Sequence, residues 1–276
     1  MKVLKERHLR YKKERKYSLI VSLIVVILLF GFNFAQSGTY YSAKVKYQYF
    51  KKEVSELILK RPDDISLRHA YFSAAFLGTP YKANTLSGDD NNKEIFTINL
   101  NQMDCYTYID YVHSLIEVKD YYNFINKLQN VRYKDGIVSF KNRNHFFYDW
   151  SQNVKGIVDA TDSILPGKSI RVLKNLNLKS NGELFLDGIP IRRVHIRYIP
   201  PDLIKESNLN NLKSGDYIGI YTDIKGLDVS HVGILIKNKR GVFFRHASSS
   251  PGIKKVIDVE FLDYIKNKPG IVVYRK

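Results

Sequence analysis

Apolar and polar positions recur with two different periods along this chain of 276 residues, first a helical period and later a strand period. Residues 43–60 alternate charged with apolar positions, which predicts an amphipathic helix that ends before Pro62. Residues 64–76 predict a second helix, with Asp64 as its cap and Gly78-Thr79-Pro80 as its stop. The chain therefore opens its folded part with helices.

A polar stretch at 82–94, rich in Asn, Asp, Ser and Gly, predicts a loop after these helices. A further helix is expected from Asp104, and residues 121–130 predict another. The apolar residues that recur at helical spacing after Asp104 are Tyr108, Ile109, Val112, Leu115 and Ile116. Cys105 is thereby placed in the first turn of a helix.

Short segments with β-branched residues and alternating polarity follow and predict strands. They are Ile137–Phe140, Ile170–Val172, Val194–Tyr198, Tyr217–Tyr221, His231–Lys237, Val242–Ala247 and Ile271–Tyr274. The polar insert 174–190, with Asn-Gly and Asp-Gly turns, predicts a hairpin over one sheet edge. Helices first and strands second predict an α+β domain, in which N-terminal helices pack on an antiparallel sheet.

The N-terminus carries a different pattern. Residues 1–17 contain eight Lys or Arg and two Glu, and the following residues up to Phe34 are almost wholly apolar. Residues 18–37 therefore predict either a cleaved signal peptide or a retained membrane anchor. Both place residues 38–276, expected to form one catalytic domain, outside the cytoplasm, either periplasmic or anchored to the membrane.

The net charge of +17 adds little to this picture. Residues 1–17 contribute +6 of it, and the remaining +11 is spread over the body of the chain. No zinc-finger spacing or RNA-binding aromatic motif accompanies the basic residues, so a nucleic-acid partner is not expected. A lysine-rich solvated surface explains the charge most simply.

Cys105 is the only cysteine, so an intrachain disulfide is excluded. A thiol at a helix N-terminus lies near the positive end of the helix dipole and near unpaired backbone N–H groups. Those groups, including the N–H of Cys105 itself, are suited to bind the oxyanion of a tetrahedral intermediate. We therefore expect Cys105 to be a nucleophile, activated by a histidine base.

Two histidines at the ends of consecutive apolar runs supply that base. If the runs form a hairpin that turns at Asn238-Lys239, residue i faces residue 477 − i and His231 lies opposite His246. A turn at Arg240-Gly241 would loosen this pairing but keep both residues at the same end of the sheet. His231 is expected to be the base, and His246 to orient it.

Residues 143–150 concentrate an arginine, a histidine, an aspartate and the only tryptophan. Arg143 or His145 would grip a substrate carboxylate or sugar hydroxyl if this segment lines a cleft. The equally supported alternative is a structural Arg–Asp tie beside a packed Trp150. His145 and Asp149 have no third ligand at metal spacing, so neither a metal nor another cofactor is expected.

The order of these motifs resembles a known group of enzymes. Taken together, Gly78-Thr79-Pro80-Tyr81, Asp104-Cys105, Gly215-Asp216, His231-Val232-Gly233-Ile234 and His246-Ala247-Ser248 resemble the NlpC/P60 superfamily of papain-like cysteine peptidases. The segments Met103–Thr107, Arg132–Gly136, Arg143–Phe146, Asp149-Trp150 and Gly226–His231 resemble the DUF1460 family, described as N-acetylmuramoyl-L-alanine amidase-like. The resemblance covers about Gly78 to Arg275.

The resemblance implies a papain-like fold and an amidase that acts on peptidoglycan or muropeptides. By position, Cys105 matches the nucleophile, His231 the base and His246 the orienting residue. The positions that match the surroundings of the cleft, and are expected to bind substrate, are Tyr81, Asp104, Arg143, His145, Asp228 and Ser230. Tyr106 and Tyr108 stand where relatives often carry smaller or different residues, which predicts a narrowed pocket.

Three functions remain open at this point. The first is cleavage between the muramoyl lactyl group and L-alanine, and the second is cleavage within the stem peptide. The third is a cell-wall-binding protein that performs no chemistry, for which the set Cys105, His231 and His246 would be unnecessary. A separation of more than about 8 Å between the Cys105 thiol and His231, with no mobile loop between them, would favour binding over catalysis.

Overall fold

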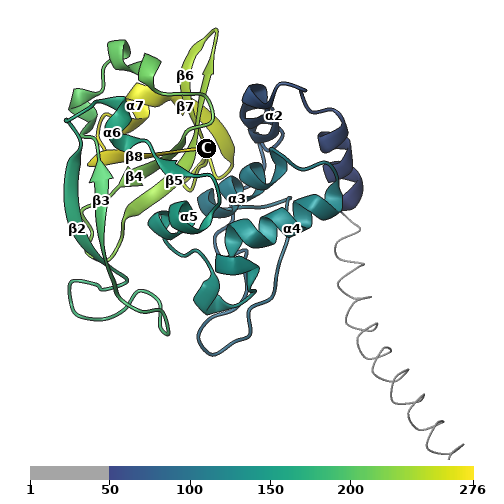
Figure 1. Ribbon diagram of the computed structural model, residues 1–276, viewed down its shortest axis with the longest axis horizontal. Coiled ribbons are helices and arrows are strands. Elements are labelled where there is room, and N and C mark those ends of the chain that lie inside the picture. Colours follow the sequence, from purple (N-terminus) through teal and green to yellow (C-terminus); the bar gives the residue numbers. More distant parts are fainter. Residues whose placement is uncertain (1–49) are drawn as a thin grey trace, which may run out of the picture. The chain divides into compact units, whose positions relative to one another are not determined.

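A computed structural model describes residues 50–276 (Figure 1). The expected signal peptide or anchor at 18–37, the basic segment 1–17 and the start of the expected helix 43–60 lie outside the described residues. The described part of that helix covers residues 50–59. Within residues 50–276, no helix is long and apolar enough to cross a membrane.

The second helical segment begins where the sequence predicted. Asp64 caps η1 (Ile65–Leu67) by accepting a hydrogen bond from the N–H of Ser66, and α2 (Arg68–Ala74) continues the segment. Two longer helices follow, α3 (Cys105–Leu115) and α4 (Tyr121–Arg132). Shorter helices are η2 (Lys134–Gly136), η3 (Phe140–Asn142), α5 (Phe147–Asn153), α6 (Thr161–Ile164), η4 (Pro201–Leu203), η5 (Glu206–Asn211) and α7 (Phe261–Ile265).

The strands form two antiparallel sheets. The six-stranded sheet has the order β1-β8-β4-β5-β6-β7, with bounds Val158–Asp159, Gly270–Arg275, Tyr217–Tyr221, Val229–Asn238, Gly241–Ala247 and Val256–Glu260 respectively. The second sheet pairs β2 (Ile170–Leu176) with β3 (Arg192–Tyr198). Residues 177–191 connect β2 to β3, where the sequence predicted a hairpin insert. The prediction of an α+β fold with helices on an antiparallel sheet is confirmed.

The central strand β4 is buried on both faces, which fixes the layers of the fold. Successive side chains of a strand point to opposite faces. Tyr217 contacts His113 of α3 and Trp150 of α5 on one face. Ile218 and Ile220, on the other face, belong to an apolar cluster that includes Phe261 and Ile265 of α7 and Ile164 of α6. Figure 1 shows α2 to α5 on one side of the sheet, and α6 and α7 on the other.

Two expectations about the strands were wrong. The segment Ile137–Phe140 is not a strand, because the Ser139 side chain accepts a hydrogen bond from the N–H of Asn142 and starts η3 instead. The sheet also contains β1 and β7, which the polarity pattern did not reveal. β1 lies at the edge of the sheet and has only two residues, which are too few to show an alternation of polar and apolar side chains.

The β5–β6 hairpin turns at Lys239-Arg240 rather than at Asn238-Lys239. Asn238 pairs with Gly241, and its side-chain oxygen accepts the N–H of Arg240 at 2.8 Å. Asn238 therefore precedes the turn instead of forming part of it. The pairing rule becomes i + j = 479, as Ile234 opposite Arg245 shows, so His231 and His246 are not directly opposed.

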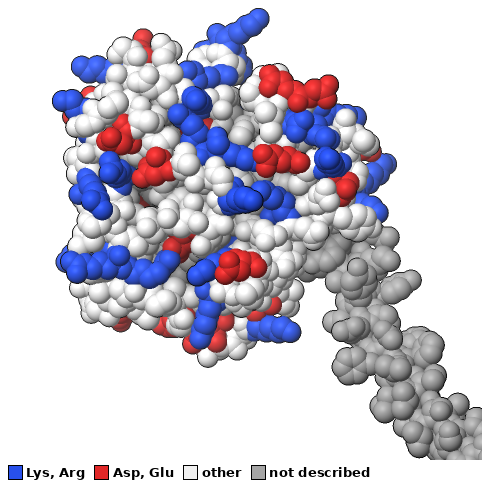
Figure 2. Space-filling model, in the orientation of Figure 1, with Lys and Arg blue, Asp and Glu red and all other residues white. Residues whose placement is uncertain are grey.

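Charged side chains are spread over the surface. On the face shown in Figure 2, Lys and Arg are interspersed with Asp and Glu and form no continuous region of one sign. Buried arginines are matched by carboxylates, for example Arg132 by Asp110 and Arg245 by Asp258. The positive charge of the body therefore agrees with the simple interpretation of a solvated lysine-rich surface.

Candidate active site

Cys105 is the first residue of α3, as the sequence predicted. Asp104 caps the helix: its Oδ1 accepts hydrogen bonds from the N–H groups of Tyr106 and Thr107 at 3.0 and 2.7 Å. The Thr107 hydroxyl accepts the N–H of Asp104 in return, which completes a capping box. Asp104 therefore stabilises the start of α3. This capping occupies the N–H groups of Tyr106 and Thr107. Of the first-turn donors proposed to bind an oxyanion, the N–H of Cys105 remains.

The thiol of Cys105 is half-buried, and its surroundings favour the neutral form. Burial and the nearby carboxylate of Asp104 raise the pKa of Cys105 to about 12. The backbone N–H of Val232 opposes this rise, which places the sulfur beside β5, next to His231. The helix dipole does not produce a thiolate here, because burial and, after it, the Asp104 carboxylate at the helix start favour the neutral thiol.

His231 and His246 contact each other directly. Nε2 of His231 lies 2.7 Å from Nδ1 of His246, and the two rings are perpendicular with centroids 4.8 Å apart. The observed register places Gly233 opposite His246, so the histidines form a diagonal pair on one face of the sheet. Gly233 is needed there, because a Cβ atom would lie 2.5 Å from the Phe244 ring. The expected partnership holds, although its register was wrong.

Both imidazoles are held neutral. Burial, His246 and Lys268 lower the pKa of His231 to about 3, and burial lowers the pKa of His246 to about 4. One proton is therefore shared between the two facing nitrogens. If Nε2 of His231 donates it, Nδ1 of His231 remains unprotonated and His246 carries its own proton on Nε2. The Nε2 of His246 is buried and has no hydrogen-bond partner within residues 50–276.

A cavity of about 100 Å³ brings several predicted residues together. Cys105, His145, Asp228, Ser230 and His231 line it, so the thiol and the expected base share one small space. Its other lining residues are Tyr106, Phe146, Phe147, Leu227, Val229 and Val232. Of the two tyrosines that were expected to narrow the pocket, Tyr106 lines the cavity, whereas Tyr108 is fully buried and does not line it.

Arg143 does not line this cavity. It forms an ion pair with the buried Glu94, and its guanidinium also donates to the carbonyls of Ser87 and Gly88. Asp149 is paired with Arg192 rather than with Arg143. Arg143 therefore has a structural role, because it holds the loop 82–94 in place. The expected ion pair between an arginine and Asp149 is present, but its arginine is Arg192 instead of Arg143.

Of the remaining predicted residues, Asp228, Ser230 and His145 line the cavity and Tyr81 lies outside it. Asp228 accepts the N–H of Tyr148, and burial raises the pKa of its carboxyl to about 6. His145 contacts the carbonyl of Phe140 through Nε2 at 2.7 Å. Tyr81 does not line the cavity, but burial and the nearby Cys105 raise its pKa, so its hydroxyl lies within the electrostatic reach of the thiol.

Tyr264 of α7 was missed by the sequence analysis. Its ring packs on Phe244 and His246, with centroid distances of 4.7 and 4.9 Å. Burial and Cys105 raise the pKa of its phenol to about 12. Nothing in the sequence around residue 264 marks it, because it approaches the site through tertiary packing of a five-residue helix.

Comparisons with known proteins place these residues in a family context. A crystal structure of an N-acetylmuramoyl-L-alanine amidase from Bacteroides uniformis matches with a TM-score of 0.62 and 25% identity, covering 76% of this chain and 98% of that one. A structure of a putative xylanase from Bacteroides fragilis matches with a TM-score of 0.60 and 29% identity, covering 74% and 99%. A Legionella pneumophila protein of the DUF1460 family has the same fold, with a TM-score of 0.69 and 24% identity over 82% of this chain and 94% of that one.

A search of curated proteins found no match. Within residues 50–276, no group of three or more His, Cys, Asp or Glu side chains is arranged to hold a metal ion. The family comparison is decisive, because one family's sequence model extends over residues 71–271 and so includes every predicted site residue. The chain belongs to the AmiA-like family, described as N-acetylmuramoyl-L-alanine amidase-like.

Proposed function

We propose that this protein is a cysteine-dependent amidase that cleaves the bond between an N-acetylmuramoyl group and L-alanine in peptidoglycan or muropeptides. The observation that carries the proposal is the shared cavity of Cys105 and His231, with His246 bonded to the far nitrogen of His231. The membership of the AmiA-like family and the amidase from Bacteroides uniformis support the substrate class.

The first half-reaction begins from a neutral thiol and a neutral imidazole. Nδ1 of His231 takes the thiol proton while the sulfur attacks the amide carbonyl, because burial disfavours a resting thiolate–imidazolium pair. His246 accepts the N–H of Nε2 and stabilises the imidazolium that forms. The N–H of Cys105 donates to the oxyanion.

Collapse of the tetrahedral intermediate completes the acyl transfer. The C–N bond breaks, and His231 returns its proton to the leaving amine of L-alanine. Water, deprotonated by the same Nδ1, then attacks the thioester, and the sulfur leaves and recovers the proton. Burial of the site keeps both charge transfers in a medium of low dielectric constant.

Replacement of Cys105 by alanine tests the proposal. Turnover of a defined muropeptide should fall by roughly four orders of magnitude or more, because the nucleophile and its base act as a unit. Mass spectrometry of the products identifies the bond: a free N-acetylmuramoyl fragment and an intact stem peptide are expected. Wild-type activity in the Cys105→Ala variant would exclude the cysteine mechanism.

The same measurement separates the other two functions. Fragments cut within the stem peptide would identify an endopeptidase of the NlpC/P60 type. Binding of muropeptides without any product, in the wild-type protein, would identify a non-catalytic wall-binding protein. The proposed substrate lies outside the cytoplasm, so the proposal includes export by residues 18–37, either as a cleaved signal peptide or as an anchor.

A further inference from the structure

A second and larger cavity lies at the other end of α3. Its volume is about 730 Å³, within the usual range for small-molecule sites. Cys105 begins α3, whereas the cavity is lined by Ile116 and Glu117 just beyond its end. Eleven helical residues, roughly 16 Å, separate the two places. The cavity is therefore distinct from the candidate catalytic site.

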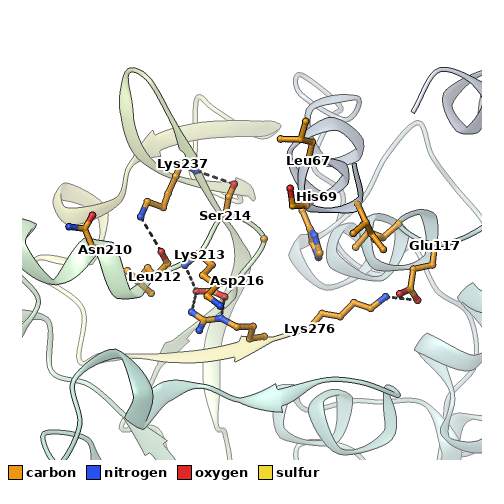
Figure 3. A pocket seen from close by; sticks show the side chains of 15 residues that line it. Leu67, His69, Glu117, Asn210, Leu212, Lys213, Ser214, Asp216, Lys237 and Lys276 are labelled. Atoms are coloured by element: carbon orange, nitrogen blue, oxygen red, sulfur yellow. Dashed lines mark hydrogen bonds and ion pairs between the residues drawn. The ribbon is translucent and has the colours of Figure 1, made fainter. Parts of the chain in front are cut away.

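The walls of the cavity come from α2, the end of α3, the segment before β4, and the ends of β5 and β8. They carry four cationic side chains and two carboxylates. Its lining residues are Ile65, Ser66, Leu67, His69, Ile116, Glu117, Asn210, Leu212, Lys213, Ser214, Gly215, Asp216, Lys237, Arg275 and Lys276. Figure 3 shows these side chains converging on one space.

Both carboxylates are already neutralised. Asp216 receives two hydrogen bonds from Arg275, at 2.6 and 2.7 Å, and a third from the backbone N–H of Lys213. Glu117 is paired with Lys276 at 2.5 Å. Two of the four cationic side chains are thereby compensated within the cavity.

The other two cations have no carboxylate partner among the described residues. The ammonium of Lys237 donates only to the backbone carbonyls of Leu209 and Leu212, at 3.0 and 3.1 Å. The exposed side chain of Lys213 takes part in none of the ion pairs of the described chain. The cavity therefore carries two uncompensated positive charges.

The positive field acts on groups around the cavity. The charge of Lys276 contributes to lowering the pKa of His69, His113 and Lys127, after the larger effect of burial in each case. His69 faces the cavity from α2 (Figure 3) and remains neutral, with a pKa of about 4.

His69 also offers an unused polar atom. Its Nε2 is buried, and no residue of the described part of the chain forms a hydrogen bond with it. The imidazole packs against the backbone of Gly215, which has a φ of +99°. A larger residue would not fit at position 215, because its Cβ would lie 2.6 Å from the His69 ring. A buried orphan nitrogen is costly unless something pairs with it, which a ligand in the cavity would do.

The rest of the lining limits the ligand. Ile65, Leu67, Ile116 and Leu212 form an aliphatic wall beside the cationic groups. A free inorganic anion would leave this wall and most of the volume unused. We propose that the cavity binds a short acidic peptide, with its carboxylates near Lys213 and Lys237, a polar group on His69, and an aliphatic part on the wall.

Such a peptide has the chemistry of the stem peptide that the amidase reaction would release. That identification rests on the proposed function, whereas the preference for a carboxylate rests on the charges of the cavity alone. Product binding at this distance from Cys105 would make the cavity a separate peptide site rather than a part of the cleft.

Calorimetric titration of the full-length Cys105→Ala protein tests the proposal without turnover. The probes are L-alanyl-D-glutamate, its diamide, in which both carboxylates are replaced by amides and the α-ammonium is kept, and inorganic phosphate. We expect one dipeptide to bind per chain, the diamide and phosphate to bind at least tenfold more weakly, and the His69 imidazole resonance to move on titration. Lys213→Met should weaken binding roughly twofold to fivefold, because one ammonium–carboxylate contact at a partly open site is lost.

Lys239→Met, at the exposed β5–β6 turn, is the matched control and should leave the affinity unchanged. Unchanged affinity in both Lys213→Met and Lys237→Met would overturn the proposal, as would equal binding of phosphate. Binding that is lost in His145→Asn but kept in Lys213→Met would place the peptide in the catalytic cavity instead, and would also overturn it. An absence of amidase turnover in the wild-type protein would contradict the proposed function and leave this binding result standing.

Discussion

Replacing His246 by alanine tests whether its contact with His231 orients the proposed base. The change removes the acceptor that lies 2.7 Å from Nε2 of His231. When His231 holds the thiol proton, this contact is a hydrogen bond to a charged donor, worth about 1.5–3 kcal/mol. Its loss should lower kcat/KM for a muropeptide by roughly 10-fold to 150-fold.

The two histidines should differ in the size of their effects. His231→Ala removes the general base itself and should cost about 10²–10⁴-fold or more. His246→Asn should recover part of the activity that His246→Ala loses, because Oδ1 of asparagine is as far along the side chain as Nδ1 of histidine and accepts the same N–H. His195→Ala, a matched change at an exposed histidine of β3, should have no effect.

The pH dependence gives a second readout for the same variant. His231 must be unprotonated to act, and its lowered pKa of about 3 keeps it so at every pH down to about 4. Burial is the largest cause of the lowered pKa of His231, and water that fills the space of the His246 ring should reduce it, so the acid limb of kcat/KM should move to higher pH despite the loss of the N–H acceptor. A larger loss in His246→Ala than in His231→Ala would show that the two roles are exchanged. Full activity in His246→Ala, with the folded state intact by circular dichroism, would show that the contact is not used.

Gly233→Ala should cost about 1–3 kcal/mol in the free energy of unfolding and also reduce kcat, because its Cβ would displace the Phe244 ring that stacks on His246; unchanged kcat and stability would contradict the close packing. Arg143→Met should lower stability by about 3–5 kcal/mol, since it leaves the buried Glu94 carboxylate unpaired; a raised KM with unchanged thermal stability would instead restore Arg143 to substrate binding. Stability should fall as pH drops from about 6.5 toward 4, because the buried histidines, His231 and His246 among them, have folded pKa values below the unfolded value and the unfolded chain takes up their protons. The raised pKa of the Asp228 carboxyl has the opposite effect on stability, but fewer groups act in that direction than there are buried histidines. A melting temperature that rises as the pH drops from 6.5 toward 4 would contradict this prediction.

Local signals in the sequence were sufficient for the parts of the site that depend on neighbouring residues. Asp104 and Thr107 form a capping box, and the apolar spacing after Asp104 fixed α3, so the position of Cys105 at the helix start was predictable. The two histidines could be assigned to one face of a hairpin because side chains alternate along strands. Their register could not, because it depends on whether Asn238 precedes the turn or forms part of it.

Contacts between distant segments were beyond the sequence. Arg143 was expected in the cleft, but its partner Glu94 lies 49 residues away and no periodicity connects them. Tyr264 reaches His246 only through the packing of α7 on β6. The helix N-terminus was also expected to favour the thiolate of Cys105, but burial, together with the carboxylate of Asp104 that caps the helix, raises the pKa of the thiol instead.

The half-buried, neutral thiol has a consequence for chemistry other than catalysis. Peroxides, alkylating agents and disulfides react with thiolates far faster than with thiols, so Cys105 should resist them while the site is empty. If the protein is exported and Cys105 is its nucleophile, as proposed, this resistance protects the only sulfhydryl of the chain from an oxidising environment. Under the proposed mechanism, Cys105 would stay a neutral, slowly reacting thiol at rest and would lose its proton only when a substrate amide carbonyl is bound beside it.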